Sequence, residues 1–430
     1  MEQTYSKHAK PGQKVLLKGW VNSVRDLGKV KFFILRDREG NIQVTLKAGS
    51  VDDKLFEIIK TLDREDCISV AGKVLESRQA PGGKEIIPEK IEIINKSAKP
   101  LPLETKEQIQ SSPDIRFDYR FFDVRNHKTK AVFRIRHSVM RGVRDFFEST
   151  GFVEVATPVI QAAGAEGGAT LFPLIYYSSE AFLRQSPQLY KQMLMASGLD
   201  RIYEIGPAFR AEKFHTRRHV SEFTSIDTEM SWIENLEDVL KACESLTHHA
   251  IKFAIKDAKG YFQILERNIA VPEIPFKRIK YEEAIKILNK EGIEIEFGED
   301  MEDSQEKILG SIMKKKGHEF YLVTHYPSKA KPFYIMMDGE DSRGFDLSNE
   351  GMELASGGQR EHRYDRLMEV MKSKGLEPNK FKFYLDAFRY GMPPHGGFAI
   401  GADRLVQQLA GVENIKDTIL FPRTPERLTP

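Results

Sequence analysis

The feature that most constrains the fold is a pair of strand-like runs joined by a short basic loop. The runs cover residues 203–212 and 221–230, and positions 217–219 of the loop hold two arginines and a histidine. Two such runs around a polar loop predict an antiparallel β-hairpin. Arg210 falls at the end of the first run, where its planar guanidinium and the loop cations would grip phosphate oxygens. The pattern predicts a polyphosphate site built on strands, although a solvated surface loop would have the same composition.

The composition argues against several classes of protein. The chain has 430 residues, enough for two or three domains, and its 65 Lys and Arg residues almost balance 63 Asp and Glu residues. No apolar run approaches the ~20 residues that span a bilayer, and the N-terminus lacks the apolar core of a signal peptide. Cys67 and Cys243 form no CxxC pattern, so neither a disulfide framework nor a zinc site is indicated. We therefore expect a cytoplasmic protein without a membrane partner.

The N-terminal part alternates short β-branched runs with turn signals. A hairpin turn is expected at 37–40, and an amphipathic helix at 53–62 separates the third run from the fourth. Five strands with a helix in this place match an OB-fold β-barrel, a small nucleic-acid-binding architecture. The five expected strands are 15–21, 31–35, 42–46, 68–74 and 86–94.

The rest of the chain predicts a second domain. We expect residues 1–98 to form the barrel, the proline-bearing stretch 99–130 a linker or hinge, and 131–430 a domain with a helical insertion at about 235–325. Its first helix has apolar residues at three- and four-residue steps and ends at Gly151. Its strand-like runs favour a mostly antiparallel sheet flanked by helices, and hence an α+β fold. The helix is marked by Ile135, Val139, Val143, Phe146 and Phe147, and the strands by 152–158, 182–184, 201–205, 209–212, 222–232, 333–337, 352–354 and 396–400.

Three segments in order resemble the motifs of the class II aminoacyl-tRNA synthetases. Residues 152–158 look like motif 1, residues 209–227 like motif 2, and residues 396–404 like motif 3. Behind an OB-like barrel, they are most similar to the aspartyl-tRNA synthetases of the archaeal and eukaryotic type. The resemblance covers nearly the whole chain. It implies a class II catalytic domain, a homodimer built through motif 1, and ATP, L-aspartate and tRNA(Asp) as partners.

The resemblance also implies roles for the polar residues of motifs 2 and 3. Arg210 would contact the α-phosphate and the amino-acid carboxylate, and Arg404 would hold the γ-phosphate; these are the two expected catalytic residues. Glu212 would accept from the adenine amino group, and Phe223 would stack on the base. The full set expected at ATP is Arg210, Glu212, Arg218, His219, Val220, Phe223, Glu353, Gly401, Ala402, Asp403 and Arg404.

Mg²⁺ is the expected cofactor. Magnesium takes one or two protein oxygens and completes its octahedron with phosphate and water. By the same resemblance, Glu353 would hold the ion against the phosphates and Ser356 would assist, with Asp346 as a further acidic candidate.

We expect a helix to begin near Ser186, with this serine as its N-cap, and to place Gln188 and Lys191 on one face. The amino acid is expected to be selected at this face. In the aspartyl enzymes the equivalents of Lys191 and Arg360 grip the side-chain carboxylate. Two cations facing one carboxylate discriminate against the amide of asparagine, which would leave buried charge unpaired. The full set expected at aspartate is Glu166, Gln188, Lys191, Arg210, Ser356 and Arg360, with Glu166 in a loop that recognises the substrate ammonium.

The resemblance places the anticodon-binding surface on the barrel. Phe32 and Gln43 lie across the turn at 37–40, and Arg25 is a third expected contact. An aromatic ring stacks on an unpaired base, and an amide reads its Watson–Crick edge. Since adjacent Phe33 points to the other face of its strand, only one of the two rings can belong to the barrel core.

Other members of the same fold remain as alternatives. Asparaginyl-tRNA synthetases generally lack the lysine at 191, and an amide-forming paralogue would not need the barrel. A catalytically inactive RNA-binding relative is disfavoured by intact Arg210, Glu353 and Arg404. Whether tRNA(Asn) is charged as well stays open, because Asn22 stands where relatives vary.

Overall fold

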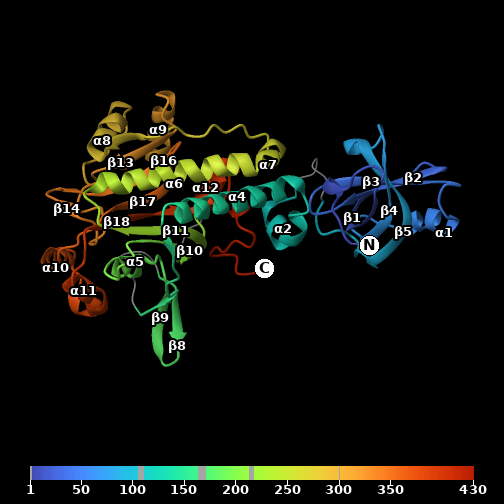
Figure 1. Cartoon of the computed structure of the whole chain (residues 1–430). Helices are drawn as coiled ribbons and strands as arrows, with labels where there is room; N and C mark the ends of the chain where they lie inside the picture. The colour runs from blue at the N-terminus through green and yellow to red at the C-terminus, as the bar shows by residue number, and fades with distance from the viewer. Residues whose placement is uncertain (1, 105–110, 163–170, 213–216, 300) are drawn as a thin grey trace. The chain divides into compact units, whose positions relative to one another are not determined.

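The computed structural model describes residues 2–104, 111–162, 171–212, 217–299 and 301–430. They belong to two compact units, Met1–Glu104 and Thr105–Pro430 (Figure 1). No helix in these ranges has both the length and the apolar character needed to cross a membrane. The division between the units falls within the stretch that the sequence suggests as a linker.

The first unit is a closed barrel with the strand order β1-β2-β3-β5-β4, which confirms the expected OB fold. Leu17, Phe33 and Val44 are among the fully buried side chains of its core. Strands β3 and β5 pair in parallel, and the other neighbours are antiparallel. The elements are β1 (Lys14–Asp26), β2 (Val30–Arg36), β3 (Asn41–Lys47), α1 (Asp53–Glu57), β4 (Cys67–Glu76) and β5 (Lys84–Asn95), with 3-10 turns at Ser6–His8, Ile58–Thr61 and Pro81–Gly83.

A sheet in the order β12-β13-β16-β17-β18-β11-β10-β6 organises the second unit. The pairs β12–β13 and β10–β6 are parallel and those between β13 and β10 are antiparallel, as the α+β class predicts. The hairpin expected around the basic loop is β10 and β11, with Phe209 opposite Glu222. The strands are β6 (Val153–Glu154), β10 (Arg201–Phe209), β11 (Glu222–Ser231), β12 (Lys277–Lys280), β13 (Phe320–Thr324), β16 (Gly344–Asn349), β17 (Met352–Gln359) and β18 (His395–Gly401).

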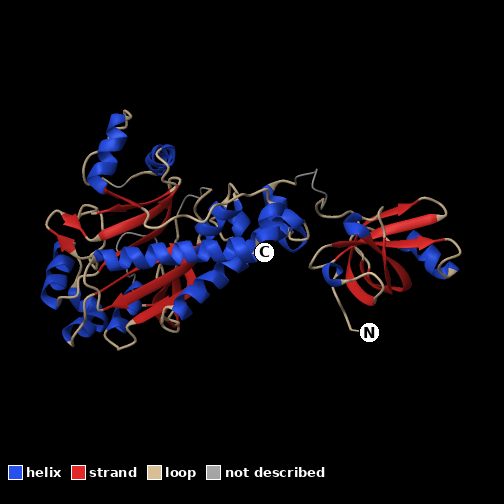
Figure 2. Cartoon of the chain, turned by 45° about the horizontal axis from the view of Figure 1, so that its top comes forward, coloured by secondary structure: helices blue, strands red, loops and turns tan. Residues whose placement is uncertain are grey.

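Two long helices, α4 (His127–Ser149) and α6 (Leu236–Asp257), lie side by side across one face of this sheet (Figures 1 and 2). The predicted apolar stripe of α4 is buried in the main core, and Gly151 follows the helix with a positive φ of 78°. The helices pack closely at Gly142, where a Cβ would lie 2.8 Å from the Phe253 Cβ. Ile226 of β11 faces this core, so its neighbours Ser225 and Asp227 face the other side of the sheet.

The remaining elements surround the sheet. The stretch β7-β9-β8 forms a separate small sheet, and β14 and β15 form a short hairpin. These strands are β7 (Ile160–Gln161), β8 (Pro173–Tyr176), β9 (Ser179–Leu183), β14 (Met337–Asp338) and β15 (Asp341–Ser342), and the helices are α2 (Pro113–Asp118), α3 (Arg120–Asp123), α5 (Gln188–Met195), α7 (Lys259–Ile264), α8 (Tyr281–Lys290), α9 (Asp303–Lys315), α10 (Tyr364–Ser373), α11 (Lys382–Arg389) and α12 (Ala402–Ala410), with 3-10 turns at Pro378–Phe381 and Ile415–Thr418.

Two regions differ from their sequence-based description. Part of the stretch 99–130 is helical, and fully buried Arg120 ties it to the C-terminal segment by donating to the carbonyls of Lys416, Asp417 and Ile419. The stretch 235–325 contains strands β12 and β13 of the main sheet as well as helices. Its helix α6 belongs to the central core, because Val239, Cys243 and the residues that follow at helical spacing are buried against the sheet.

One strand expectation is wrong. Residues 333–336 form no strand in the structure, although their composition is apolar and aromatic. Phe333, Tyr334 and Ile335 are instead buried in a cluster with helices α10 and α11. Burial outside the sheet satisfies an apolar run as well as a strand does, so composition alone did not distinguish the two.

The adjacent rings of β2 give a matched test of the barrel. Phe33 is fully buried and Phe32 is partly exposed on the other face. We expect Phe33→Ala to lower the unfolding free energy of the barrel by about 3–5 kcal/mol, because it leaves a cavity, and Phe32→Ala to lower it by much less. Urea denaturation followed by circular dichroism measures both. Equal losses for the two variants would contradict the assignment of faces.

Candidate active site

A cavity of about 240 Å³ opens on the sheet face opposite α4 and α6. Its walls come from the start of α5, from the residues that follow β10, from β11, β17 and β18, from the start of α12, and from the segment around Lys331. It brings together residues that are more than two hundred positions apart in the sequence. The predicted residues that line it are Gln188, Lys191, Arg210, Glu212, Arg218, His219, Val220, Phe223, Glu353, Ser356, Arg360, Gly401, Asp403 and Arg404.

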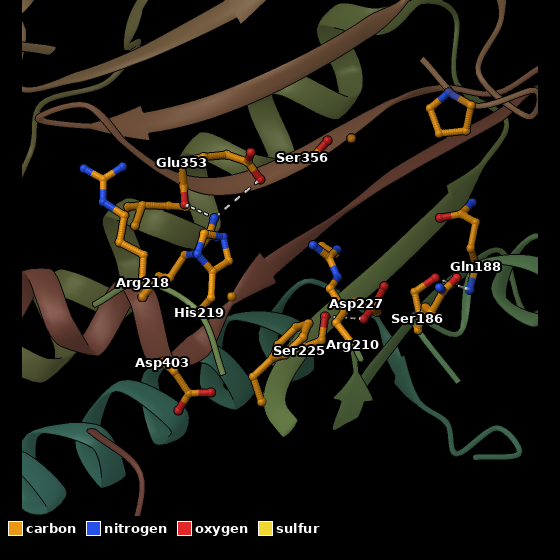
Figure 3. A pocket seen from close by; sticks show the side chains of 18 of the residues that line it. Ser186, Gln188, Arg210, Arg218, His219, Ser225, Asp227, Glu353, Ser356 and Asp403 are labelled. Atoms are coloured by element: carbon orange, nitrogen blue, oxygen red, sulfur yellow. Dashed lines mark hydrogen bonds and ion pairs between the residues drawn. The ribbon is translucent and has the colours of Figure 1, made fainter. Parts of the chain in front are cut away.

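The pocket has two chemically different ends, with Arg210 between them. Figure 3 shows Arg218, His219 and Glu353 on one side of Arg210, and Gln188 on the other. The Arg210 guanidinium carbon lies 5.5 Å from the centre of the Phe223 ring. Its buried Nε has no hydrogen-bond partner in the described part of the chain. A buried donor of this kind is normally satisfied, so it is available to a ligand.

Arg404 organises the end that contains Glu353. Its Nη1 donates to the Glu353 carbonyl at 3.0 Å and lies 3.9 Å from Oε1 of the same residue. Its Nη2 lies 3.4 Å from Nε2 of His219. Burial lowers the pKa of His219, and the neighbouring Arg404 charge lowers it further. The imidazole is therefore held neutral, with Nε2 as the acceptor toward Arg404.

Arg218 is held at the same end by helix α9. Its Nη1 lies 3.5 Å from Oε2 of Glu306 and 3.9 Å from Oδ1 of Asp303. Burial and the nearby Glu353 carboxylate raise the pKa of Glu306 to about 8, although Arg218 acts in the opposite direction. The two carboxylates come from the region 235–325, in which the sequence offered no motif.

A β-bulge in β17 brings Glu353 and Ser356 to the pocket. Residues three apart on a regular strand point to opposite faces. The pairing of β16 with β17 shifts register between Leu347 and Ser348, which are opposed by the three residues 353–355. The extra residue shifts the alternation of side-chain directions by one position, so the side chains of Glu353 and Ser356 both line the cavity.

This oxygen pair fits magnesium. A carboxylate and a hydroxyl on one face are hard donors, and Mg²⁺ needs only one or two of them. Larger clusters of three metal-binding His, Cys, Asp or Glu side chains do not occur in the described ranges. Asp346, the further candidate, accepts from Lys331 Nζ with both oxygens, at 2.9 and 2.8 Å. We therefore assign Asp346 to holding Lys331 at the pocket wall.

The other end of the pocket is a buried cluster of four charges. Arg360 donates through Nε and Nη2 to the two oxygens of Glu229 at 2.8 and 3.2 Å. Lys191 Nζ lies 3.1 Å from Asp227 Oδ1 and 3.5 Å from Glu229 Oε2. All four side chains are at least 96% buried. Burial alone would raise the pKa of Glu229, but the charges of Arg360 and Lys191 more than offset this and lower it.

A directed chain of hydrogen bonds supports this cluster. Arg360 Nη2 approaches the Gln188 oxygen at 3.4 Å, Gln188 donates to Gln192 Oε1 at 2.9 Å, and the Gln192 amide donates to His395 Nε2 at 3.0 Å. His395 Nδ1 bonds the Pro393 carbonyl at 2.9 Å. A carbonyl only accepts, so Nδ1 of His395 carries the proton and Nε2 is an acceptor. The amide nitrogen of Gln192 must therefore donate to Nε2, which leaves its oxygen to accept from Gln188.

Three predicted residues stand apart from the rest. Ala402 is buried and is not among the residues that line the cavity. Asp403 lines it, but one carboxylate oxygen accepts from Arg136 and the other from the Thr224 N–H at 2.8 Å. These contacts make Asp403 a support for β11, and its contact with ATP stays a prediction. Glu166 lies outside the described residues.

The sequence analysis missed several residues of the pocket. Ser225 and Asp227 line the pocket, and Glu229 continues their alternation on β11 behind the lining. Polar residues at every second position of a central strand were a usable signal. No pattern in the sequence indicated Gln185 as a site residue. It is 98% buried and lines the pocket, yet neither its Nε2 nor its Oε1 has a partner in the described ranges. Its amide is thus available to a ligand.

The residues expected on the barrel surface share one face of its sheet. Phe32 is the direct cross-strand partner of both Arg25 and Thr45, so these three side chains form a row. Gln43 lies one pair along the same face, where its amide donates to Thr45 Oγ1 at 3.0 Å and to Glu85 at 3.1 Å. The amide is largely buried and held in one orientation.

Protonation of His395 gives a prediction for stability. Burial lowers its pKa to about 4, below the ~6.5 of an unfolded histidine. Between these values only the unfolded chain takes up the proton, so the contribution to stability is complete above pH ~6.5 and is lost as the pH falls toward 4, by about 3 kcal/mol. Urea denaturation at several pH values should show this slope in the unmodified chain. A His395→Asn variant with the same slope would refute the assignment.

Comparisons with known proteins agree with this architecture. Residues 112–425 match the family of class II tRNA synthetases (D, K and N), and residues 15–94 match an OB-fold nucleic acid binding domain. The chain is 48% identical to an aspartate–tRNA(Asp) ligase of Thermococcus kodakarensis, over 97% of each chain, and 46% identical to an aspartate–tRNA(Asp/Asn) ligase of Archaeoglobus fulgidus, over 100% of each. Its structure matches that of asparaginyl-tRNA synthetase from Pyrococcus horikoshii complexed with asparaginyl-adenylate, with a TM-score of 0.94, 35% identity and full coverage of both chains. The chain belongs to the class II tRNA synthetases of the D, K and N family.

Proposed function

We propose that this protein attaches L-aspartate to tRNA(Asp) in an ATP-dependent reaction that passes through an aspartyl-adenylate. The observation that carries the proposal is the pair of buried cations, Lys191 and Arg360, at the end of the pocket remote from Arg218. The ligase names of the relatives at 46–48% identity support the same reaction. A site for a second carboxylate distinguishes aspartate from most other amino acids.

In the activation step, an oxygen of the aspartate α-carboxylate attacks the α-phosphorus of ATP, and pyrophosphate leaves. The two reactants are anions, so the site must neutralise and align them. Arg210 lies between the two ends of the pocket and is suited to contact both groups. Arg404 and Arg218 would take the outer phosphates, and Phe223, which the guanidinium of Arg210 approaches, would stack on the adenine.

Glu353 and Ser356 would hold Mg²⁺ beside the phosphates. The ion would neutralise phosphate charge and favour the departure of pyrophosphate. His219, kept neutral by burial and Arg404, would accept from Arg404 and fix its orientation. Glu212 lines the same cavity and offers a carboxylate to the adenine amino group.

Discrimination against asparagine would depend on Arg360. Its Nε and Nη2 bind Glu229, while Nη1 has no acceptor in the described part of the chain. The contacts of Lys191, at 3.1 to 3.5 Å, are longer than the ~2.7–2.9 Å of a strong charge-assisted bond. A substrate carboxylate would offer both cations a further acceptor at a shorter distance, whereas an asparagine amide would present two N–H donors to them.

The barrel face with Arg25, Phe32 and Gln43 would read the anticodon of the tRNA. Phe32 offers a partly exposed ring for stacking, and Arg25 beside it offers charge to the backbone. Glu85 and Thr45 orient the Gln43 amide toward one set of base atoms. A second function, charging of tRNA(Asn), is favoured by the relatives named for both tRNAs.

We also infer a cytoplasmic homodimer assembled through motif 1. Val153 of β6 and Ile160 of β7 are each 44% exposed. Apolar side chains on short strands at the edge of a domain are suited to a subunit interface.

Aspartate should support the exchange of pyrophosphate into ATP, and asparagine should not. Lys191→Leu should lower kcat/KM for aspartate by at least about tenfold, because one charged contact contributes ~1.5–3 kcal/mol, and should change KM for ATP much less. Steady-state exchange assays with labelled pyrophosphate measure both constants. Exchange supported equally by asparagine would refute the choice of substrate.

Transcripts of tRNA(Asp) and tRNA(Asn) should separate the two tRNA specificities. We expect aspartylation of tRNA(Asp), and Phe32→Ala should raise KM for this tRNA by about fivefold or more while pyrophosphate exchange is unchanged. Charging of tRNA(Asn) at a comparable rate would establish the dual specificity. Failure to charge either transcript, with exchange intact, would contradict the proposed transfer step.

A further inference from the structure

Helix α9 reaches the phosphate end of the pocket from the stretch 235–325. Glu306 and Asp303 are one turn apart on the same face of α9, and their carboxylates flank the guanidinium of Arg218 at 3.5 and 3.9 Å. The side chain of Arg218 is 11% exposed and that of Glu306 21%, whereas Asp303 is 48% exposed. Glu306 is therefore the closer and better shielded partner.

The position of α9 is fixed by direct contact between backbones. A Cβ at Gly310 would lie 2.1 Å from the nitrogen of Gly351, and a Cβ at Gly351 would lie 2.4 Å from the carbonyl oxygen of Glu306. Such spacing leaves no room for a side chain, so the helix sits on the turn between β16 and β17. Lys314 of the same helix adds an ion pair with Glu350 at 2.8 Å.

This contact couples α9 to the strand that carries Glu353. Gly351 lies two residues before Glu353, so a shift of α9 would also move the start of β17. Arg218 belongs to the basic loop of the β10–β11 hairpin and lies at the same end of the pocket as Glu353. The Arg218–Glu306 pair thus joins the hairpin to the strand that bears Glu353.

We propose that Glu306 is a positioning residue that orients Arg218 toward the outer phosphates of ATP and toward pyrophosphate. The inference rests on the proposed function and assigns to α9 a part in nucleotide binding. An arginine on a loop has many rotamers. A carboxyl group fixed on a helix reduces that freedom before the ligand arrives, because its oxygen can accept from the guanidinium whether or not the group is protonated. The gain should appear only for ligands that Arg218 contacts.

The experiment measures pyrophosphate exchange by the full chain with Glu306→Ala, Arg218→Ala and the double variant. Glu306→Ala should raise KM for ATP and for pyrophosphate by about fivefold and leave KM for aspartate within about twofold. In the Arg218→Ala background, Glu306→Ala should have almost no further effect, because its role passes through Arg218. Lys315→Gln, at an exposed position near the C-terminal end of the same helix, is the matched control and should leave all three constants unchanged.

Several results would overturn the proposal. A lower KM for ATP in Glu306→Ala would mean that the carboxylate only repels the nucleotide. Additive effects in the double variant would mean that Glu306 acts without Arg218. An equal rise of KM for aspartate would mean that Glu306 acts only through the fold, and the thermal midpoint of each variant would show such a loss of stability. Absence of aspartate-dependent exchange in the unmodified chain would refute the proposed function itself. Normal exchange in the unmodified chain, together with variants that do not show the expected changes in KM, would refute only this inference.

Discussion

Burial of Glu229 at the centre of the sheet is the constraint on which the end of the pocket with Lys191 and Arg360 depends. A fully buried carboxylate is costly unless cations are supplied close to it. Arg360 and Lys191 supply them, and together they keep the pKa of Glu229 low despite the burial. The same two cations face the cavity. Stability of the sheet and the proposed recognition of a substrate carboxylate therefore use one set of side chains.

The rest of the site follows from where the strands end. Arg210 stands one residue beyond β10, and Arg404 lies in the first turn of α12, just after β18. Strand ends place long side chains over the sheet without interrupting its hydrogen bonds. The central strands β11, β17 and β18 bring the two arginines to one pocket although they are 194 positions apart in the sequence. The polar face of each strand lines the pocket while the apolar face packs on α4 and α6.

Sequence patterns predicted those parts of the structure that depend on residues close together in the chain. We could predict the barrel strands, the apolar stripe from Ile135 to Phe147 and the basic hairpin from the sequence. The spacing of apolar residues and the residue types of turns are properties of neighbouring residues. The resemblance supplied most of the pocket residues. Partners that depend on packing could not be read in this way. Glu306, Gln185 and Lys331 come from segments without a motif, and the contact between Asp403 and Arg136 also depends on packing.

The bulge in β17 has a consequence for how this strand tolerates change. Its single additional residue decides which side chains point into the pocket, because the alternation of inward and outward side chains is shifted by one residue at that position. Removal of one residue there would restore regular pleating and rotate Glu353 to the apolar side, while Ser356 and Arg360 kept their direction. Length at this point of the chain is therefore under as strong a constraint as chemical identity.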